Sequence, residues 1–331
     1  MQYKSCQWVN RGIEFRTDEI RLCCYGYLQG RETEYQTTLF TDYHGGKIDW
    51  DAFFKKKDEL KQMHKEGKYL DACKDCIYLH EQDWDEENYI NHFTFNHWTK
   101  CNCNCTYCYT NGDKKAFNKY KEYKIYPIIK DMFKQGIIKK MGESCLCFGG
   151  GEPTILQEFE ELVYLLLDYD VYNIRIHSDG IKYSPAIEKG LKLGKITLIT
   201  SVDSSSQKIY EQVKQVPCFD KVWENLSKYA KTKNGLIRTK YVLIPGVNDS
   251  LKEVKNWLQK TYDVGIKHIA FDIEDNWFKA RRDNIPQYIY VIFDFVTECY
   301  KQYNIDSCEL YERAYNLKVD RENKLNSSSM K

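Results

Sequence analysis

The sequence predicts an α/β protein with a parallel sheet, because short apolar runs alternate with amphipathic segments from about residue 89 onward. Six runs have the length of strands: residues 90–95, 144–148, 173–177, 195–201, 236–244 and 268–272. Helical patterns lie near residues 120–140, 157–169, 185–193, 205–231 (broken around Pro217), 249–262 and 285–303. Repeated strand–helix–strand units with right-handed crossovers suit a curved sheet or a partial (β/α)6 barrel. We therefore predict a core over residues 89–280, with a C-terminal helix and tail, residues 281–331, packed on it.

Composition and charge exclude several classes of protein. The 331 residues are 42% hydrophobic and 29% charged, which is typical of a folded chain and not of a membrane protein. The 49 Lys and Arg against 48 Asp and Glu leave a net charge of +1, so no general field favours nucleic acid. We find neither a signal peptide nor an apolar run long enough for a membrane span, and expect a cytoplasmic protein.

Smaller features are predicted from local patterns. Residues 49–66 indicate a charged surface helix with Asp49 as its N-cap, and the three lysines at 55–57 are expected on its solvated face. Asn248 or Asp249 is expected to cap the helix that follows the fifth strand. The polar residues 321–331 are expected to fray.

The fourteen cysteines are many for a reducing compartment, where disulfides do not persist, and nine of them precede residue 110. Cys101, Cys105 and Cys108 follow the first predicted strand with the spacing CxxxCxxC. Three thiolates on so short a loop can hold three corners of a cubane cluster and leave one iron open. Cys103 offers a different triad, and a zinc site made from Cys105, Cys108 and two other residues is an alternative from spacing alone.

The cysteine motif, with Tyr107 just before its last cysteine, resembles the cluster motif of the radical S-adenosylmethionine (radical SAM) superfamily. Four further motifs stand in that family's order: FGGGEPTIL (148–156), IHSDG (176–180), SVDSS (201–205) and KYVLIPGVND (240–249). The resemblance favours Cys101 over Cys103 as a ligand and leaves Cys103 as a spare thiol. It covers about residues 89–280.

This resemblance implies a mechanism and its cofactors. The open iron would bind S-adenosylmethionine, and an electron from a donor such as flavodoxin or ferredoxin would pass through the 4Fe–4S cluster and cleave it to a 5'-deoxyadenosyl radical. By resemblance, the residues predicted to bind this cofactor are Tyr107, Gly150, Gly151, Glu152, Ser201 and Lys214. Lys214 stands near where many relatives carry an arginine, and Asp179 replaces an asparagine of the third-strand turn. His177 is expected to be a core histidine, and Asp272 and Glu274 to face substrate or ribose.

The first 88 residues form a predicted Cys-rich N-terminal extension with its own β-hairpin, residues 12–24. Its cysteines supply four thiolates and one spare, which is one of the adjacent pair: Cys6, Cys23, Cys24, Cys73 and Cys76. The arrangement resembles the first half of the SPASM or twitch extension and implies a second 4Fe–4S cluster; a four-cysteine zinc site and unligated thiols are the alternatives.

The sequence therefore predicts a radical SAM enzyme that acts on a peptide or protein side chain. One alternative keeps the chemistry but takes a sugar, nucleotide or other small metabolite. A third hypothesis is a non-catalytic, zinc-stabilised binding protein.

Overall fold

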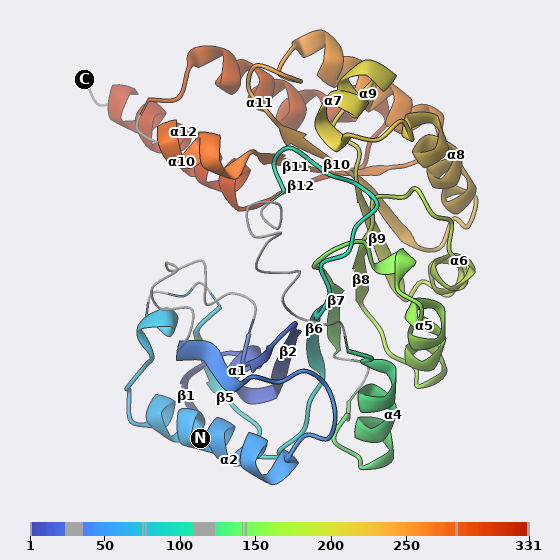
Figure 1. Ribbon diagram of the computed structural model, residues 1–331. Helices are drawn as coiled ribbons and strands as arrows, with labels where there is room; N and C mark the ends of the chain where they lie inside the picture. The colour runs from blue at the N-terminus through green and yellow to red at the C-terminus, as the bar shows by residue number, and fades with distance from the viewer. Residues whose placement is uncertain are drawn as a thin grey trace. The chain divides into compact units, whose positions relative to one another are not determined.

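The computed structural model describes residues 2–23, 36–74, 76, 78–108, 123–140, 142, 144–281 and 284–329 (Figure 1). The chain divides into two compact units. The first comprises Met1–Lys100 and Asp113–Ile176, and the second comprises Cys101–Gly112 and His177–Lys331. Cys24, one of the predicted ligands, lies outside the described residues.

The sheet of the first unit runs in the order β8-β7-β6-β2-β3-β4. Its strands are β2 (Gly12–Arg16), β3 (Glu19–Arg21), β4 (Thr38–Thr41), β6 (His92–Asn96), β7 (Cys145–Phe148) and β8 (Ile174–His177). Neighbours from β2 to β8 are parallel, whereas β3 pairs antiparallel with both β2 and β4. A separate antiparallel pair joins β1 (Gln2–Ser5) to β5 (His80–Asp83).

The predicted N-terminal hairpin is not a separate extension. Strands β2 and β3 pair antiparallel, but β2 also pairs parallel with β6 along its whole length, Gly12–Arg16 against His92–Asn96. Ile13 and Phe15 are fully buried on one face of β2, and Glu14 is fully buried on the other. A strand that is covered on both faces belongs inside a sheet, so the first strand of the hairpin continues the main sheet.

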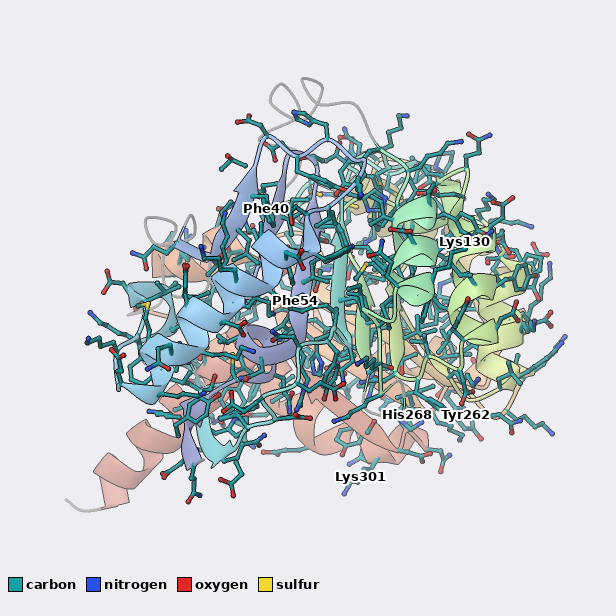
Figure 2. The ribbon with its side chains drawn as sticks, turned by 90° about the horizontal axis from the view of Figure 1, so that it is seen from below. Phe40, Phe54, Lys130, Tyr262, His268 and Lys301 are labelled. Carbon is teal, nitrogen blue, oxygen red and sulfur yellow. The ribbon has the colours of Figure 1, made fainter. Side chains whose placement is uncertain are left out.

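The helices of the first unit are α1 (Gln7–Arg11), α2 (Trp50–Lys65), α4 (Tyr126–Lys134) and α5 (Phe159–Asp168), with 3₁₀ turns η3 (Asp71–Cys73) and η5 (Pro153–Ile155). Asp49 caps α2 as predicted, accepting a hydrogen bond from the Ala52 amide (3.0 Å). Phe53 of α2 stacks on Phe40 of β4, with ring centroids 6.4 Å apart. Figure 2 labels Phe40 and, one residue further along α2, Phe54.

The prediction that residues 55–57 lie on a solvated face is wrong for Lys57, which is fully buried. Helical periodicity explains the error, since residues spaced by three or four share one face. The buried residues of α2 are Trp50, Phe53, Lys57, Lys61 and His64. Lys57 therefore belongs to the inward stripe of the helix, between an aromatic side chain and a second lysine.

The second unit has four parallel strands in the order β9-β10-β11-β12. They are β9 (Ile196–Ser201), β10 (Leu236–Leu243), β11 (His268–Ile273) and β12 (Ser307–Leu310). The helices are α6 (Pro185–Lys192), α7 (Gln207–Lys214), α8 (Phe219–Ala230), α9 (Leu251–Asp263), α10 (Asp275–Arg281), α11 (Gln287–Cys299) and α12 (Glu312–Ser329), with a 3₁₀ turn η6 (Tyr300–Tyr303). Among the described residues, no helix is both long and apolar enough to cross a membrane.

All six predicted strands are present in the two units, with parallel neighbours, and the predicted helix over 205–231 is broken at Pro217 into α7 and α8. Strand β12 was not predicted, because its four residues are all half-buried and give no alternating pattern. Residues 321–329 of the tail predicted to fray belong instead to α12, which buries Ala314 and Leu317 near its start, and the last two residues lie outside the described ones. Closure into a barrel stays a prediction.

Asn248 joins the end of β10 to the segment after β9, and it does not cap a helix as predicted. Its Nδ2 donates to the carbonyls of Asp203 and Val242 (both 2.9 Å), and its Oδ1 accepts from the Ile244 amide (2.7 Å). The N-cap of α9 is Ser250, whose side chain accepts from the Glu253 amide. A side chain that satisfies three buried backbone groups fixes the loop more tightly than a cap would.

Replacing Asn248 by Ala should therefore lower the free energy of unfolding by about 2–4 kcal/mol, because three buried backbone groups lose their partners. Asn234→Ala is the matched control, since its exposed amide makes one hydrogen bond, to the Lys192 carbonyl. It should cost less than about 1 kcal/mol. Urea denaturation of both variants measures the difference, and equal losses would contradict the role given to Asn248.

Candidate functional site

The cysteine loop, residues 101–108, belongs to the second unit. Its four thiols differ in their exposure to solvent. Cys101 is exposed and Cys105 and Cys108 are half-buried, whereas Cys103 is only 8% exposed. The Cys108 amide donates to the Cys105 carbonyl (3.2 Å), which closes a turn between these two residues. The three cysteines predicted as ligands are thus the more accessible ones, and Cys103 lies beneath them.

The loop is anchored to the C-terminal end of α7 through its backbone. The Asn104 amide donates to the Lys214 carbonyl (3.0 Å), and the Thr106 amide donates to the Val213 carbonyl (2.9 Å). The last carbonyls of a helix have no partner within the helix, so they are free to accept bonds from another segment. These backbone bonds therefore anchor the loop to α7 without using any cysteine side chain.

A buried polar triad adds to this anchor. The Tyr107 hydroxyl donates to the Asp203 carboxylate (2.6 Å), and the Lys214 ammonium donates to the Tyr107 hydroxyl (2.8 Å) and pairs with Asp203. Asp203 is fully buried, with φ +60°, and also accepts from the Val242 amide (2.7 Å). Sequence reasoning placed Tyr107 and Lys214 at this site but missed Asp203, the aspartate of the SVDSS motif.

Lys214 is held in this triad as a charged group. Burial by itself lowers the pKa of Lys214, but Asp203 and Tyr107 raise the pKa well above its usual value. The ammonium is 2% exposed and already has a carboxylate partner. Its contacts are therefore internal ones, whereas the sequence predicted a bond to a cofactor carboxylate.

The thiols of the loop differ in acidity. The hydrogen bond with the Cys103 thiol lowers the pKa of Cys105 to about 6 against the effect of burial, and the charge of Lys214 acts in the same direction. Hydrogen bonding with Cys101 and Cys105 raises the pKa of Cys103, and its thiol also donates to the Asp179 carboxylate (3.5 Å). These opposite shifts favour the thiolate form of Cys105, which is the form that binds iron, and the thiol form of Cys103.

Charged side chains gather around Asp272 at the end of β11. Asp272 is 4% exposed and pairs with Lys240 (3.4 Å) and Arg313 (3.6 Å). The Lys240 ammonium also lies 3.7 Å from the centre of the Tyr311 ring. Sequence reasoning singled out Asp272 but not its two cationic partners, which come from β10 and from α12.

The other predicted residues of this unit have different surroundings. Ser201 is half-buried at the end of β9 and stands in register with Lys240 of β10. His177, at the end of β8, is half-buried. Glu274 accepts from the amides of Asn276 (3.1 Å) and Trp277 (2.7 Å), so its carboxylate stabilises the start of α10.

The glycine-rich turn belongs to the first unit, where it lies against the chain that leads to the cysteine loop. A Cβ at Gly151 would lie 2.0 Å from the Lys100 carbonyl oxygen, and one at Gly150, where φ is +77°, would lie 2.7 Å from that of Trp98. The Glu152 amide donates to the Lys100 carbonyl (2.9 Å). Lys100 directly precedes Cys101, so these two positions require glycine for the close approach of two backbones.

The Glu152 carboxylate is 2% exposed and caps the η5 turn. Its Oε1 accepts from the Thr154 amide (3.0 Å) and from the Thr154 hydroxyl (2.5 Å). The predicted bond from Glu152 to the ammonium of a cofactor stays a prediction.

Four of the five N-terminal cysteines line one cavity of about 20 Å³ in the first unit. They come from three segments of the chain: Cys6, Cys23, and the pair Cys73 and Cys76. The Cys6 sulfur accepts from the Val9 amide (3.4 Å) and so caps α1. Burial raises the pKa of Cys6 to about 11 and that of Cys73 to about 12, and the sulfur of Cys76 adds to both shifts. Four of the five cysteines predicted as ligands thus line one cavity, and their role as ligands stays a prediction.

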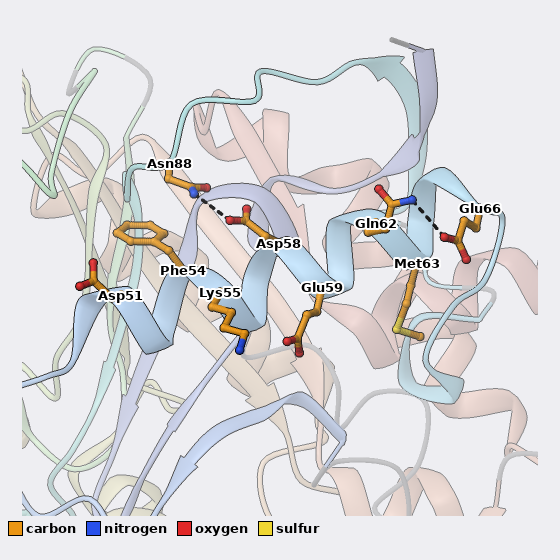
Figure 3. A pocket seen from close by; sticks show the side chains of 9 residues that line it. All are labelled: Asp51, Phe54, Lys55, Asp58, Glu59, Gln62, Met63, Glu66 and Asn88. Carbon is orange, nitrogen blue, oxygen red and sulfur yellow. Dashed lines mark hydrogen bonds between the residues drawn. The ribbon is translucent and has the colours of Figure 1, made fainter.

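A larger groove, of about 710 Å³, runs along the outer face of α2 (Figure 3). Its polar groups bond to one another, Asn88 to Asp58 (3.0 Å) and Gln62 to Glu66 (3.0 Å). The groove contains no cysteine and gives no chemistry to the site. In the described part of the chain, no three Cys, His, Asp or Glu side chains stand at the spacing of ligands to a single metal ion.

Comparison with known proteins decides the family of the central region. The model of the Radical SAM superfamily matches residues 95–258. This chain contains a radical SAM domain. Such a domain implies a 4Fe–4S cluster and S-adenosylmethionine, and enzymes of the superfamily are catalytic. The zinc alternative for the CxxxCxxC loop loses its support.

Curated relatives match the radical SAM domain at low identity. GTP 3',8-cyclase of Haemophilus influenzae is 24% identical over 160 residues, which cover 48% of this chain and 46% of that protein. The 7,8-dihydro-6-hydroxymethylpterin dimethyltransferase of Methanocaldococcus jannaschii is 29% identical over 166 residues, 46% of this chain and 30% of that protein. The match thus spans half or less of these relatives.

Solved structures extend the likeness beyond the domain. Streptococcus suis SuiB bound to S-adenosylmethionine has a TM-score of 0.54 and 10% identity, covering 81% of this chain and 57% of that chain. SuiB bound to the precursor peptide SuiA has a TM-score of 0.52, also at 10% identity, covering 82% and 57%. At this identity the likeness concerns the fold.

Gly151→Ala should lower the free energy of unfolding by about 1–3 kcal/mol, because the new methyl group would overlap the Lys100 carbonyl. It should also reduce the iron bound by the reconstituted protein, since Lys100 leads directly into the cysteine loop. Gly142→Ala is the matched control, because nothing lies within 4 Å of a Cβ there. Thermal unfolding and iron analysis of both variants measure the two effects, and a neutral Gly151→Ala would show that the turn tolerates a side chain.

Proposed function

We propose that this chain is a radical SAM enzyme in which Cys101, Cys105 and Cys108 hold the 4Fe–4S cluster that binds S-adenosylmethionine. The observation that carries the proposal is the anchored loop within a radical SAM domain. Three accessible thiols stand on it, one of which is acidic. When bound, the cluster and S-adenosylmethionine supply a reductive cleavage whose 5'-deoxyadenosyl radical takes hydrogen from a substrate.

The donor set fits an iron–sulfur cluster. Thiolates are the ligands that such clusters require, and the low pKa of Cys105 supplies one without a change of pH. Cys103 assists by donating to its neighbours, and its own raised pKa keeps it protonated. We therefore assign Cys103 the role of a positioning thiol that is not a ligand.

The chain's own polar groups prepare the site. Asp203 holds Tyr107 and Lys214, and through them it fixes the loop that carries the thiols. The positive charge of Lys214 stabilises the Cys105 thiolate. We propose that Lys214 acts on the cluster through charge and through the Tyr107 contact, while Tyr107 and Ser201 offer hydroxyl groups for S-adenosylmethionine.

The glycine-rich turn is proposed as the part that receives the methionine end of S-adenosylmethionine. Gly150 and Gly151 expose backbone without side chains, and the Glu152 carboxylate is an acceptor suited to an ammonium group. Burial strengthens any further bond that this carboxylate makes.

We propose a peptide or protein side chain as the substrate. The fold likeness, over 82% of this chain, to SuiB bound to its precursor peptide supports this class. A small metabolite such as a nucleotide or sugar is the second candidate, favoured by the names of the curated relatives, which are a GTP cyclase and a pterin methyltransferase. The charged group of Lys240, Asp272 and Arg313 suits a polar substrate of either class. Substrate-dependent formation of 5'-deoxyadenosine separates the two candidates. A flavodoxin or ferredoxin is the proposed electron donor.

We also propose that the Cys-rich residues 1–88 carry a second 4Fe–4S cluster on Cys6, Cys23, Cys73 and Cys76, with Cys24 as the spare. The convergence of cysteines from three separate segments on one largely apolar cavity supports a metal site there. A single zinc ion is the alternative, favoured by the small volume of that cavity. No three of the described Cys, His, Asp or Glu side chains stand at the spacing of ligands to one ion, so zinc binding would require these sulfurs to move closer together.

Replacing Cys101, Cys105 and Cys108 together by Ala should remove one cluster, about four irons per chain, and abolish the reductive cleavage of S-adenosylmethionine. Cys103→Ala should keep the iron and the cleavage, because Cys103 is not proposed as a ligand. Anaerobic reconstitution, iron analysis and chromatography of 5'-deoxyadenosine measure these effects. If Cys103→Ala loses activity while Cys101→Ala retains it, the ligand assignment is wrong.

If the N-terminal cysteines bind a second cluster, metal should remain in the protein after the first cluster has been removed. In the triple-Ala protein, about four irons should remain, and further replacement of Cys73 and Cys76 by Ser should remove them. Cys145→Ser and Cys147→Ser form the control, since these half-buried thiols lie on β7 away from the cavity. About one zinc in place of the iron would establish the zinc alternative, and no metal of either kind would refute the site.

A further inference from the structure

Lys57 is a fully buried lysine whose ammonium faces backbone carbonyls. Its Nζ donates to the carbonyl oxygens of Gly12 (2.7 Å) and Trp8 (3.0 Å), and it lies 5.5 Å from the centre of the Phe53 ring. Trp8 is the second residue of α1, and Gly12 is the first residue of β2. These contacts satisfy hydrogen bonds, but they supply partial charges and no anion.

No carboxylate in the described part of the chain forms an ion pair with Lys57. Lys61, one turn further along α2, is 4% exposed but pairs with Asp58 (2.6 Å) and donates to Asn88 (2.6 Å). Of the two lysines on the buried face of α2, Lys61 thus has a carboxylate partner among the described residues and Lys57 does not. An ammonium without a counter-ion is costly to bury, so a negative charge near Lys57 would lower this cost.

The closest candidates for that charge are the N-terminal cysteines. Cys6 caps one end of α1 with its sulfur, and Lys57 bonds the Trp8 carbonyl within the same five-residue helix. Trp8 itself lines the cysteine cavity. Burial and the like charge of Lys61 lower the pKa of Lys57 to about 7, whereas the sulfurs of Cys6 and Cys23 raise it.

The other charged groups around Lys57 do not compensate it. Asp58, which has a weak effect on Lys57, is half-exposed and paired with Lys61. Burial lowers the pKa of His92 to about 4, and the charges of Lys57 and Arg11 add to this shift. The electrostatic potential around Lys57 is therefore positive while the cysteines are protonated.

A metal site with four thiolates would reverse that potential. A zinc ion or an oxidised 4Fe–4S cluster bound by four cysteines carries a net charge of about −2, which must be stabilised inside the protein. We propose that Lys57 is the buried counter-charge of the metal site formed by Cys6, Cys23, Cys73 and Cys76, and that its charge favours the loaded site over the empty one. This inference rests on the metal site proposed above and holds for either metal.

A structural role is the competing explanation, since the bonds of Lys57 also join α2 to α1 and β2. Lys57→Gln keeps a hydrogen-bond donor but removes the charge, and Lys57→Arg keeps the charge. Lys57→Met is a second neutral variant of similar length, for use if the glutamine variant does not fold. Lys61→Gln is the matched control, because it removes a buried lysine whose charge is already compensated.

The test uses the full-length protein with Cys101, Cys105 and Cys108 replaced by Ala, so that the N-terminal site supplies the metal signal. Chelator competition gives the metal affinity, and redox titration gives the midpoint potential if iron is bound. The neutral variants should bind metal at least about tenfold more weakly, with a more negative midpoint potential, because a nearby positive charge is lost. Lys57→Arg should stay within about threefold of the parent, and Lys61→Gln should lose stability without a change in affinity.

Each contrary result has a separate meaning. Unchanged affinity and potential in the neutral variants would overturn the role of Lys57 and leave the metal site standing. Equal losses in the neutral variants, Lys57→Arg and Lys61→Gln, would show a structural role and also overturn the inference. Absence of metal from the triple-Ala protein would overturn the metal site and, with it, its counter-charge.

Discussion

The contacts of the buried Asp203 carboxylate hold the cysteine loop in place within the second unit. The carboxylate joins a loop residue, Tyr107, to a helix residue, Lys214, and to the backbone of a strand at Val242. Removing a carboxylate from water is costly, and here three donors compensate it, one of which is the Lys214 ammonium. Loss of Lys214 would leave the buried carboxylate without a counter-charge, so the position of Tyr107 in the cysteine loop depends on a helix that follows it far along the chain.

Backbone bonds to α7 and the Tyr107 hydroxyl fix the cysteine loop. Sulfur atoms also take part in local structure at both thiol sets. The Cys101 sulfur accepts from the Cys103 amide (3.4 Å), and the Cys6 sulfur caps α1 while Cys6 lines the N-terminal cavity. Metal binding at either place would therefore exchange one contact of a sulfur for another.

The sequence predicted the elements that have strong local patterns, including the six strands, the break at Pro217 and the Asp49 cap. It failed where distant contacts decide the outcome. Strand β2 belongs to the main sheet because β6 covers its edge, and Lys57 is buried because α2 packs over α1. Neither fact can be inferred from the neighbouring residues in the sequence, since lysine and glutamate in a short run usually indicate a solvent-exposed face.

The same distinction applies to the candidate site. Cysteine spacing predicted a ligand set on the short loop of residues 101–108, and this set stays a prediction. For the N-terminal cysteines, the structure adds a cavity that Cys6 and Cys23 line together with Cys73 and Cys76. Asp203, Lys240 and Arg313 were missed because single charged residues have no spacing that marks them. Their partners lie on other elements, so only the folded chain identifies them.

The anchor of the cysteine loop also has a consequence for biosynthesis. Tyr107 and its partner Lys214 are 107 positions apart, so the loop leaves the ribosome long before α7 exists to hold it. At roughly 5–20 residues per second, the delay is on the order of five to twenty seconds. During that time the thiols of residues 101–108 have no scaffold and stand open to oxidation or to the wrong metal. Insertion of the proposed cluster into an anchored loop therefore has to wait at least until α7 has been made.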